Sequence, residues 1–447
     1  MNNRRRTIVL VTQGASVELL ERWVSAGRLP AFAQLFARGV HGQLISGPVP
    51  YEVPGIVSVV TGRTPGEHGM FSFWSSHERH DEPRVLASNE MQAQPAWRRP
   101  ELGDLKFGLI NVYGTHPPAE INGWVLSYAM EQTLRSSYPG SLMMELAQRG
   151  VRYAQDVSTW YSGQARGDFL PKVLEADRHR GLACQYLWEQ GADVIFVVLT
   201  SLDRTGHHYW QELEPGAPIA EQESAPFQGF AMCDAILGRL LELAGDQATL
   251  IALSEQGFGP LRAYVSVNRA LARRGFLAYA DPVSDSAIDW SHTSAFETAQ
   301  GTHGIDLNLK GRSSPGRIDA ADFERVRSEL ISLLREVDNP HTGLKLFRSV
   351  QRREEVYSGP HVSRAPDIIL EPLDERYQPL GHPHWARRVN RAWHSGWHRR
   401  QSYFAVCGPS VRQRWAARPG ATIDVLPTLF AALGRDVPRD LEGQVWL

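Results

Sequence analysis

Apolar runs that stop abruptly at polar residues are the most regular feature of the sequence. The stretch 192–199 is apolar apart from Asp193 near its start and is rich in β-branched residues, and it is followed by Asp203 and His207. A run without polar alternation predicts a strand buried on both faces, as in a parallel sheet. The runs 7–12 and 249–253 have the same character. Polar residues that follow such strands lie where open α/β sheets bind their ligands.

Amphipathic stretches separate these runs and predict helices. The alternation of strand and helix indicates an α/β fold with a mainly parallel sheet covered by helices on both faces. Further strands are expected at 40–45, 107–112, 124–128, 305–309 and 403–407, and helices at 17–26, 31–38, 141–149, 171–190, 227–244, 320–337 and 423–433. A further helix is expected to follow the turn-rich stretch 47–54 and to end at about Thr61. The pattern loosens after Pro260. We therefore expect a core over 1–259, an insertion or cap over 260–391, and a return to the core over 392–447.

Composition narrows the class of protein. The 447 residues include 47 basic and 49 acidic side chains, a formal net charge of -2, which does not indicate nucleic acid or an anionic membrane as the partner. No apolar run approaches the ~20 residues of a membrane helix, and the N-terminal stretch is too short for a signal peptide. Cys184, Cys233 and Cys407 are far apart and do not predict a disulfide framework. We expect a soluble, cytoplasmic protein with a small-molecule substrate, and the sequence leaves the oligomeric state open.

Asp203 and His207 are the first candidates for chemistry. If a helix begins after the strand 192–199, residues four apart lie on one face and can bind one metal ion. The alternative is an aspartate that caps the helix and a histidine on the surface, which is the more common meaning of an isolated D-x-x-x-H. Similar polar strand ends elsewhere in the chain favour the metal site.

Eight short motifs follow one another along nearly the whole chain, at 27–35, 61–69, 202–207, 308–312, 357–360, 365–367, 396–399 and 423–429. In this order they resemble the type I phosphodiesterase/nucleotide pyrophosphatase branch of the alkaline phosphatase superfamily. The resemblance implies an alkaline-phosphatase-like α/β fold and a hydrolase that binds two divalent metals, usually zinc, at the C-terminal ends of the sheet. One metal would be held by Asp203, His207 and His398. Two imidazoles and one carboxylate leave a fourth position open, as in catalytic zinc sites.

The second half of the family site is altered. Where the family has an Asp, a Thr or Ser nucleophile, and an Asp-His pair, this sequence has Gln13, Glu52, Glu255 and Gln256. Neutral amides are poor ligands for zinc, so a second zinc ion is not expected. The four side chains could suit a hard cation such as Mg²⁺ or Ca²⁺, or could hydrogen-bond one another without a metal.

These changes favour a metal-dependent enzyme without a covalent phospho-enzyme. We expect one metal, zinc, as the Lewis acid, with Glu52 or else Glu255 as general base or acid. Substrates could then include esters, amides and other carbonyl compounds as well as phosphate esters. The alternatives are a phosphodiesterase or phosphatase with an altered second metal site, and a pseudoenzyme that binds a ligand.

Four further residues are candidates for substrate contacts. Tyr113 and His116 lie in a loop that matches the rim of the family site, where ordinary loop structure is an equal alternative. His303 lies in the expected insertion and could cap the pocket. Trp397 precedes His398 and is expected in the pocket wall or in an aromatic interface between cap and core.

Overall fold

A large, mostly parallel sheet forms the centre of the first part of the chain. The computed structural model describes residues 5–74, 85–130, 132–281, 284–298, 301–313, 315–379, 394–409 and 411–447. Within these residues the sheet has ten strands in the order β19-β2-β18-β7-β1-β6-β3-β4-β5, with β20 beside β2. The bounds are β1 Arg6–Thr12, β2 Val40–Ile45, β3 Phe107–Val112, β4 Gly123–Ser127, β5 Ser137–Tyr138, β6 Val194–Leu199, β7 Ala248–Leu253, β18 Gln401–Cys407, β19 Arg414–Trp415 and β20 Gly420–Ala421. This α/β architecture confirms the predicted fold class.

The middle of the sheet is parallel because each strand returns through a helix. β1 pairs in parallel with β6 on one side and β7 on the other. β3 continues the parallel part beside β6, whereas β18 runs antiparallel between β7 and β2. The ends of β1, β6 and β7 therefore meet at one edge of the sheet, which positions the polar residues that follow them.

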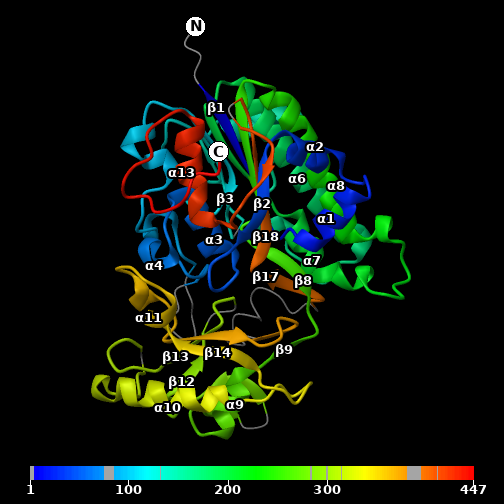
Figure 1. Ribbon diagram of the computed structural model, residues 1–447. Coiled ribbons are helices and arrows are strands. Elements are labelled where there is room, and N and C mark those ends of the chain that lie inside the picture. The colour runs from blue at the N-terminus through cyan, green and yellow to red at the C-terminus, as the bar shows by residue number, and fades with distance from the viewer. Residues whose placement is uncertain are drawn as a thin grey trace. The chain divides into compact units, whose positions relative to one another are not determined.

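Helices cover both faces of this sheet. In Figure 1, α1, α2, α6 and α8 lie on one side of it and α3 and α13 on the other. Their bounds are α1 Val17–Ser25, α2 Pro30–Arg38, α3 Glu52–Thr61, α6 Arg166–Glu189, α8 Ala225–Ala244 and α13 Val425–Ala432, and the short helix α5 spans Leu142–Gln148. Most predicted bounds agree within two residues. Helix α6 begins before Pro171, where the sequence predicted its start, because Phe169 and Leu170 are buried in a local cluster with Tyr209.

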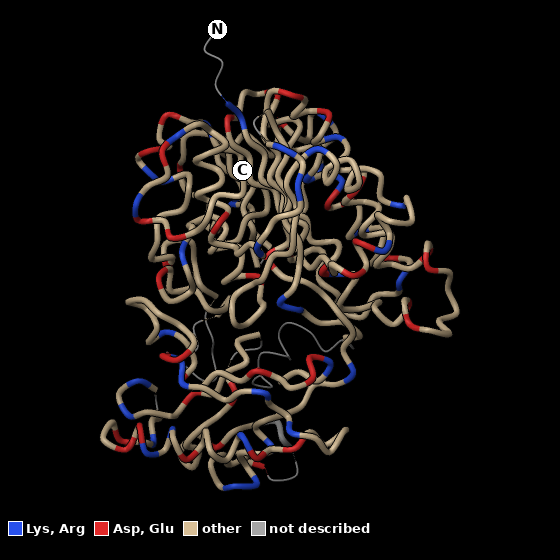
Figure 2. The backbone as a smooth tube through the Cα atoms, in the orientation of Figure 1, with Lys and Arg blue, Asp and Glu red and all other residues tan. Residues whose placement is uncertain are grey.

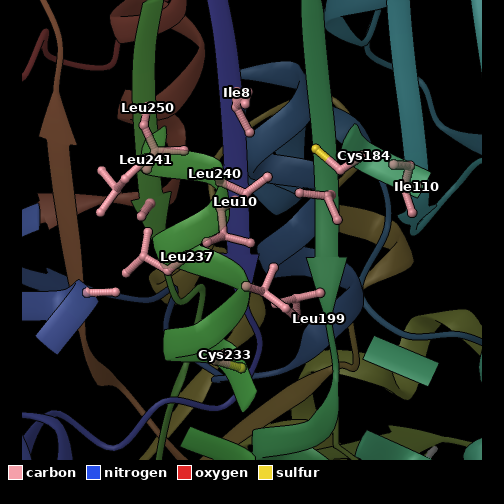
Figure 3. Close-up of a cluster of buried hydrophobic side chains, with 14 of the residues drawn as sticks. Ile8, Leu10, Ile110, Cys184, Leu199, Cys233, Leu237, Leu240, Leu241 and Leu250 are labelled. Atoms are coloured by element: carbon pink, nitrogen blue, oxygen red, sulfur yellow. The ribbon is translucent and has the colours of Figure 1, made fainter. Parts of the chain in front are cut away.

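The two faces of each central strand are both apolar. Ile8 and Leu10 of β1 belong to the core cluster on the α8 side, and Val9 and Val11 point to the other face and are equally buried. Figure 3 shows Leu237, Leu240 and Leu241 of α8 with the β1 residues. Burial on both faces explains why these strands lack polar alternation in the sequence.

The chain divides into two compact units. The first comprises Met1–Arg63, Ala87–Pro260 and Trp393–Leu447, and the second comprises Thr64–Leu86 and Leu261–Ala392. The second unit contains the antiparallel sheet β12-β13-β15-β14, formed by Ala295–Glu297, Gly304–Leu307, Ile368–Pro372 and Phe347–Arg352. Helices α9 (Val267–Arg273) and α10 (Phe323–Arg335) contribute Leu271 and Leu330 to its own apolar core.

Charged residues are interspersed along the chain and are sparse in the central strands of the sheet (Figure 2). No helix among the described residues is long and apolar enough to cross a membrane. The three cysteines are buried and free.

Candidate metal centre and altered half-site

The strands β1, β6 and β7 deliver the candidate residues to one edge of the sheet. Gln13 follows β1 directly, and α7 (Ser201–Tyr209) begins right after β6. Glu255 and Gln256 lie between β7 and the short strand β8 (Gly257–Pro260), which pairs with β17 (Gly396–Arg399). In that pair His398 lies opposite Phe258. A ligand from the C-terminal part of the chain thus joins residues from the central strands.

Helix α7 carries two of the predicted ligands on its buried face. Asp203 lies in its first turn and His207 one turn later, and both are buried. The N-cap is Thr200, and the backbone N–H groups of Thr200 and Ser201 donate to the remote carboxylate of Asp177 at 3.1 and 2.7 Å. Asp203 is therefore not the helix cap and His207 is not on the surface. The alternative reading of the D-x-x-x-H pattern is wrong here.

Three ligand atoms converge in this place. His398 Nε2 lies 3.0 Å from Asp203 Oδ1 and 3.1 Å from His207 Nε2. His207 Nε2 lies 3.5 Å from the same carboxylate oxygen. Ligand atoms of one tetrahedral zinc ion, at Zn–N distances near 2.0–2.1 Å, are separated by roughly 3.3 Å. The three side chains form a group whose spacing fits a single metal ion.

The other ring nitrogens of the two histidines fix their tautomers. His207 Nδ1 lies 3.1 Å from the carbonyl oxygen of Gly396, and His398 Nδ1 lies 3.3 Å from that of Pro50. A carbonyl only accepts, so each Nδ1 donates, and each neutral ring then has a lone pair on Nε2. Two lone pairs 3.1 Å apart repel unless a proton or a cation lies between them. Orientation of the ring through Nδ1 is also the usual arrangement of metal-bound histidines.

Asp203 belongs to a buried ionic network. Arg204 joins the carboxylate of Asp203 to that of Asp156, and Arg180 joins Asp156 to Asp177. All five side chains are at least nine-tenths buried. Three carboxylates and two guanidinium groups leave one net negative charge. Burial opposes ionisation of Asp203, but His207 and Arg204 lower its pKa well below the usual range. A buried anionic network next to two imidazole lone pairs suits a divalent cation.

The four altered positions also lie together and are buried. Glu52 is the first residue of α3, and the Glu255 side chain packs against Gly55, one turn further along that helix. Both carboxyl oxygens of Glu255, both amide atoms of Gln256 and Oε2 of Glu52 have no hydrogen bond of normal geometry. Gln13 donates from Nε2 to the Tyr113 hydroxyl at 3.1 Å. Gln13 also acts as a hydrogen-bond donor to the Glu255 carboxyl group, which opposes the effect of burial on the pKa of Glu255.

Burial and mutual repulsion favour the protonated forms of the two glutamates. Burial, followed by the nearby Asp203, raises the pKa of Glu52 to about 8. Burial, followed by Glu52 and Asp203, raises the pKa of Glu255 well above its usual value. The half-site next to the three ligands can thus hold or release protons near neutral pH.

The remaining predicted residues lie in different surroundings. Tyr113 is buried, and its ring stacks on Tyr128 with the centroids 4.0 Å apart. His116 Nδ1 lies 3.3 Å from Ser127 Oγ. Trp397 is buried and stacks on the His398 ring at 4.8 Å, so it supports a candidate ligand directly. His303 is a buried residue of the second unit with a positive φ of 49°. The segment 380–393, which includes His382, His384 and Trp393, lies outside the described residues.

Sequence reasoning missed the network behind Asp203. Arg204 stands next to the ligand in the sequence, and Asp177 and Arg180 are charged residues three apart on the buried face of α6. Charges on the apolar face of a helix were a usable signal, because burial without pairing is costly. Asp156 lies in the short 3₁₀ segment Asp156–Thr159, and nothing in its sequence context marks it.

Comparison with known proteins agrees with this architecture. A family model described as type I phosphodiesterase/nucleotide pyrophosphatase matches residues 7–399. Murine ectonucleotide pyrophosphatase/phosphodiesterase 5, inactive and in complex with AMP, is similar over 99% of this chain and 98% of that chain, with a TM-score of 0.59 and 15% identity. Phosphonoacetate hydrolase from Sinorhizobium meliloti 1021, in complex with phosphonoacetate, is similar over 96% and 95% of the two chains, with a TM-score of 0.61 and 17% identity. No curated protein matches the sequence significantly.

The chain therefore belongs to the type I phosphodiesterase/nucleotide pyrophosphatase family. This confirms the resemblance predicted from the eight motifs. At these identities the solved structures establish the shared fold alone, and the chemistry depends on the site residues of this chain.

Proposed function

We propose that this chain is a metal-dependent hydrolase in which one divalent ion, zinc, is held by Asp203, His207 and His398. The observation that carries the proposal is the convergence of both histidine Nε2 atoms on Asp203 Oδ1 while each Nδ1 donates to a backbone carbonyl. Two nitrogen ligands and one carboxylate are a common donor set of catalytic zinc. When bound, the ion would supply Lewis acidity that polarises a substrate oxygen or acidifies a water molecule.

The N-terminal turn of α3 lacks the serine or threonine hydroxyl that would form the covalent phospho-enzyme of the family. Its first residues are Glu52, Val53, Pro54 and Gly55, and no hydroxyl group is present among them. A water molecule is then the simplest nucleophile. Glu52 has a free, buried Oε2 beside the ligand group, and a carboxyl group with a pKa near 8 can take and return a proton around neutral pH.

The charge of the site favours substrates with little negative charge. Asp203, Glu52 and Glu255 interact electrostatically in a buried space, and Arg204 is committed to Asp203 and Asp156. Once a bound cation has lowered the pKa of the two glutamates, a phosphate dianion would meet their carboxylates with that single cation to offset them. Neutral esters and amides, which have a polarisable carbonyl group, face no such repulsion.

Phosphodiester hydrolysis is the second candidate. It is favoured by family membership and by the buried oxygens of Glu255 and Gln256, which are suitable ligands for a hard cation. A second, hard ion at the altered half-site would then supply the positive charge that offsets the negative charge of a phosphodiester.

Metal content and substrate choice separate these possibilities. Protein purified without chelator would be analysed for metals, together with His398→Ala, and tested on 4-nitrophenyl acetate and bis(4-nitrophenyl) phosphate. One zinc per chain, lost in His398→Ala, with ester hydrolysis that Glu52→Gln abolishes, supports the proposal. Glu18→Gln, an exposed glutamate in the first turn of α1, is the matched control and should retain activity.

Other results lead to other conclusions. Two metals per chain with activity on the phosphodiester alone would establish the second candidate. Ester hydrolysis that survives Glu52→Gln would contradict the role of Glu52. No bound metal after incubation with zinc or manganese would refute the metal-dependent hydrolase and leave a ligand-binding pseudoenzyme.

A further inference from the structure

Arg204 holds one particular oxygen of the candidate metal ligand. Its Nη1 group donates to Asp203 Oδ2, whereas Asp203 Oδ1 is the atom nearest to His207 and His398. The side chain of Asp203 is fully buried and that of Arg204 is 9% exposed. The two carboxylate oxygens thus have separate surroundings, one cationic and one lined by imidazole lone pairs.

The other end of the Arg204 guanidinium group is held by Asp156. Arg204 Nη2 donates to Asp156 Oδ2, which also accepts from the indole N–H of Trp160 at 3.2 Å. Asp156 Oδ1 accepts from the Thr200 hydroxyl at 2.9 Å and from Arg180 at 3.1 Å. The charges of Arg204 and Arg180 outweigh burial and lower the pKa of Asp156 to about 2.

The network ends where α7 begins. Arg180 donates to Asp177 Oδ1 at 2.7 Å, and Asp177 accepts the backbone N–H groups of Thr200 and Ser201. The same set of charges therefore fixes the start of the helix that carries Asp203 and His207, and the rotation of the Asp203 carboxylate. Such groups behind metal ligands tune the affinity of many sites.

We propose that Arg204 is a positioning residue that reserves Oδ1 of Asp203 for the metal ion and keeps this carboxylate monodentate. The inference rests on the proposed metal site. Because Oδ2 is committed to Arg204, Asp203 can offer one oxygen and the site remains low-coordinate, which suits zinc better than cations that prefer bidentate carboxylates. Lysine has one ammonium group and cannot bridge Asp203 and Asp156 as a planar guanidinium does.

The test measures metal binding rather than turnover. Zinc affinity would be obtained by chelator competition for the wild type, Arg204→Lys and Arg180→Lys, together with the visible spectrum of each Co²⁺-loaded protein. Arg180 is the matched control, since it is buried in the same network and contacts Asp156 and Asp177 but makes no ion pair with Asp203. Asp156→Asn, which weakens the outer anchor of Arg204, provides a second variant if Arg204→Lys does not fold.

We expect Arg204→Lys to lose about 10–100-fold in zinc affinity, the usual effect of removing a group behind a metal ligand. Its Co²⁺ absorption should weaken as the carboxylate becomes bidentate and the coordination number rises, and Asp156→Asn should shift both quantities in the same direction. Arg180→Lys should lose less than Arg204→Lys in both quantities, because it leaves the contact between Arg204 and Asp203 in place. Unchanged affinity or an unchanged spectrum in Arg204→Lys, or an equal loss in Arg180→Lys, would overturn the positioning role while the metal site stands. A wild type that binds no zinc would overturn the proposed function itself.

Discussion

Replacement of Glu52 by glutamine should make the metal-free protein more stable at alkaline pH. In the unfolded chain Glu52 ionises near pH 4.5, whereas in the folded protein its pKa is raised to about 8, first by burial and then by Asp203. Between these two values the folded state holds a proton that the unfolded state has released. The free energy of unfolding therefore falls as the pH rises from about 4.5 to about 8.

The size of the effect follows from the same shift. Each pKa unit corresponds to about 1.4 kcal/mol, so a difference between 4.5 and about 8 gives an upper figure of about 4–5 kcal/mol. Glu255 and Asp203 share the local field, and removing one carboxyl group relieves them too. Glutamine has nearly the same shape as glutamic acid but does not ionise. The free energy of unfolding of Glu52→Gln should therefore exceed that of the wild type by up to about 4 kcal/mol at pH 8 and differ little from it at pH 5.

Urea unfolding in EDTA at several pH values between 5 and 8 is the appropriate assay. Glu18→Gln, at an exposed position in the first turn of α1, is the control for a glutamate-to-glutamine change outside the site. A stability advantage of Glu52→Gln that fails to grow with pH would refute the reasoning, and so would a variant less stable than the wild type at pH 8. Added zinc should flatten the pH dependence of the wild type, because a nearby cation lowers the pKa of Glu52.

Three further predictions concern the metal and the packing around the site. Zinc at 100 times its dissociation constant should stabilise the wild type by about 2.7 kcal/mol in thermal unfolding and leave the stability of His398→Ala unchanged. An equal gain in stability in both proteins would show that zinc binds elsewhere. Gly55→Ala should cost about 1–3 kcal/mol in spite of the better helix propensity of alanine, because its Cβ would lie 2.7 Å from Glu255 Cγ. Gly167→Ala in α6, whose Cβ would meet no atom within 4 Å, should instead stabilise by roughly 0.5–1 kcal/mol, and both are measured by urea unfolding.

The sequence predicted the fold well because the central strands carry a strong local signal. β1, β6 and β7 are buried on both faces, and such strands must be continuously apolar, which makes them visible without any knowledge of the fold. The start of α6 was misplaced because proline is a good first residue of a helix, and the burial of Phe169 and Leu170 that extends the helix depends on tertiary contacts.

The candidate metal ligands could be predicted from the sequence, whereas the residues that position them could not. Asp203, His207 and His398 were found through motifs, and the structure brings their ligand atoms together. The link from Asp203 through Arg204 depends on Asp156, which lies in a short 3₁₀ segment 47 positions before Asp203, and pairing over such a distance has no periodic signature. The state of Glu52 and Glu255 likewise depends on burial, which composition cannot reveal.

His398 and Asp203 are 195 residues apart in the chain, yet their side chains lie 3.0 Å from each other. A metal ion bound by both would act as a reversible cross-link that closes a loop containing residues 261–392 of the second unit. For a covalent cross-link that closes a loop of this length, the lost entropy of the unfolded chain corresponds to a stabilisation of roughly 5 kcal/mol. The ion would restrict the unfolded chain in the same way if it stayed bound to both ends. During synthesis the ligand set is complete only after β17 has emerged. A retained metal ion would thus show that the segment carrying His398 has joined the segment carrying Asp203 and His207. A protease cut within the loop would leave the C-terminal segment attached for as long as the ion is bound.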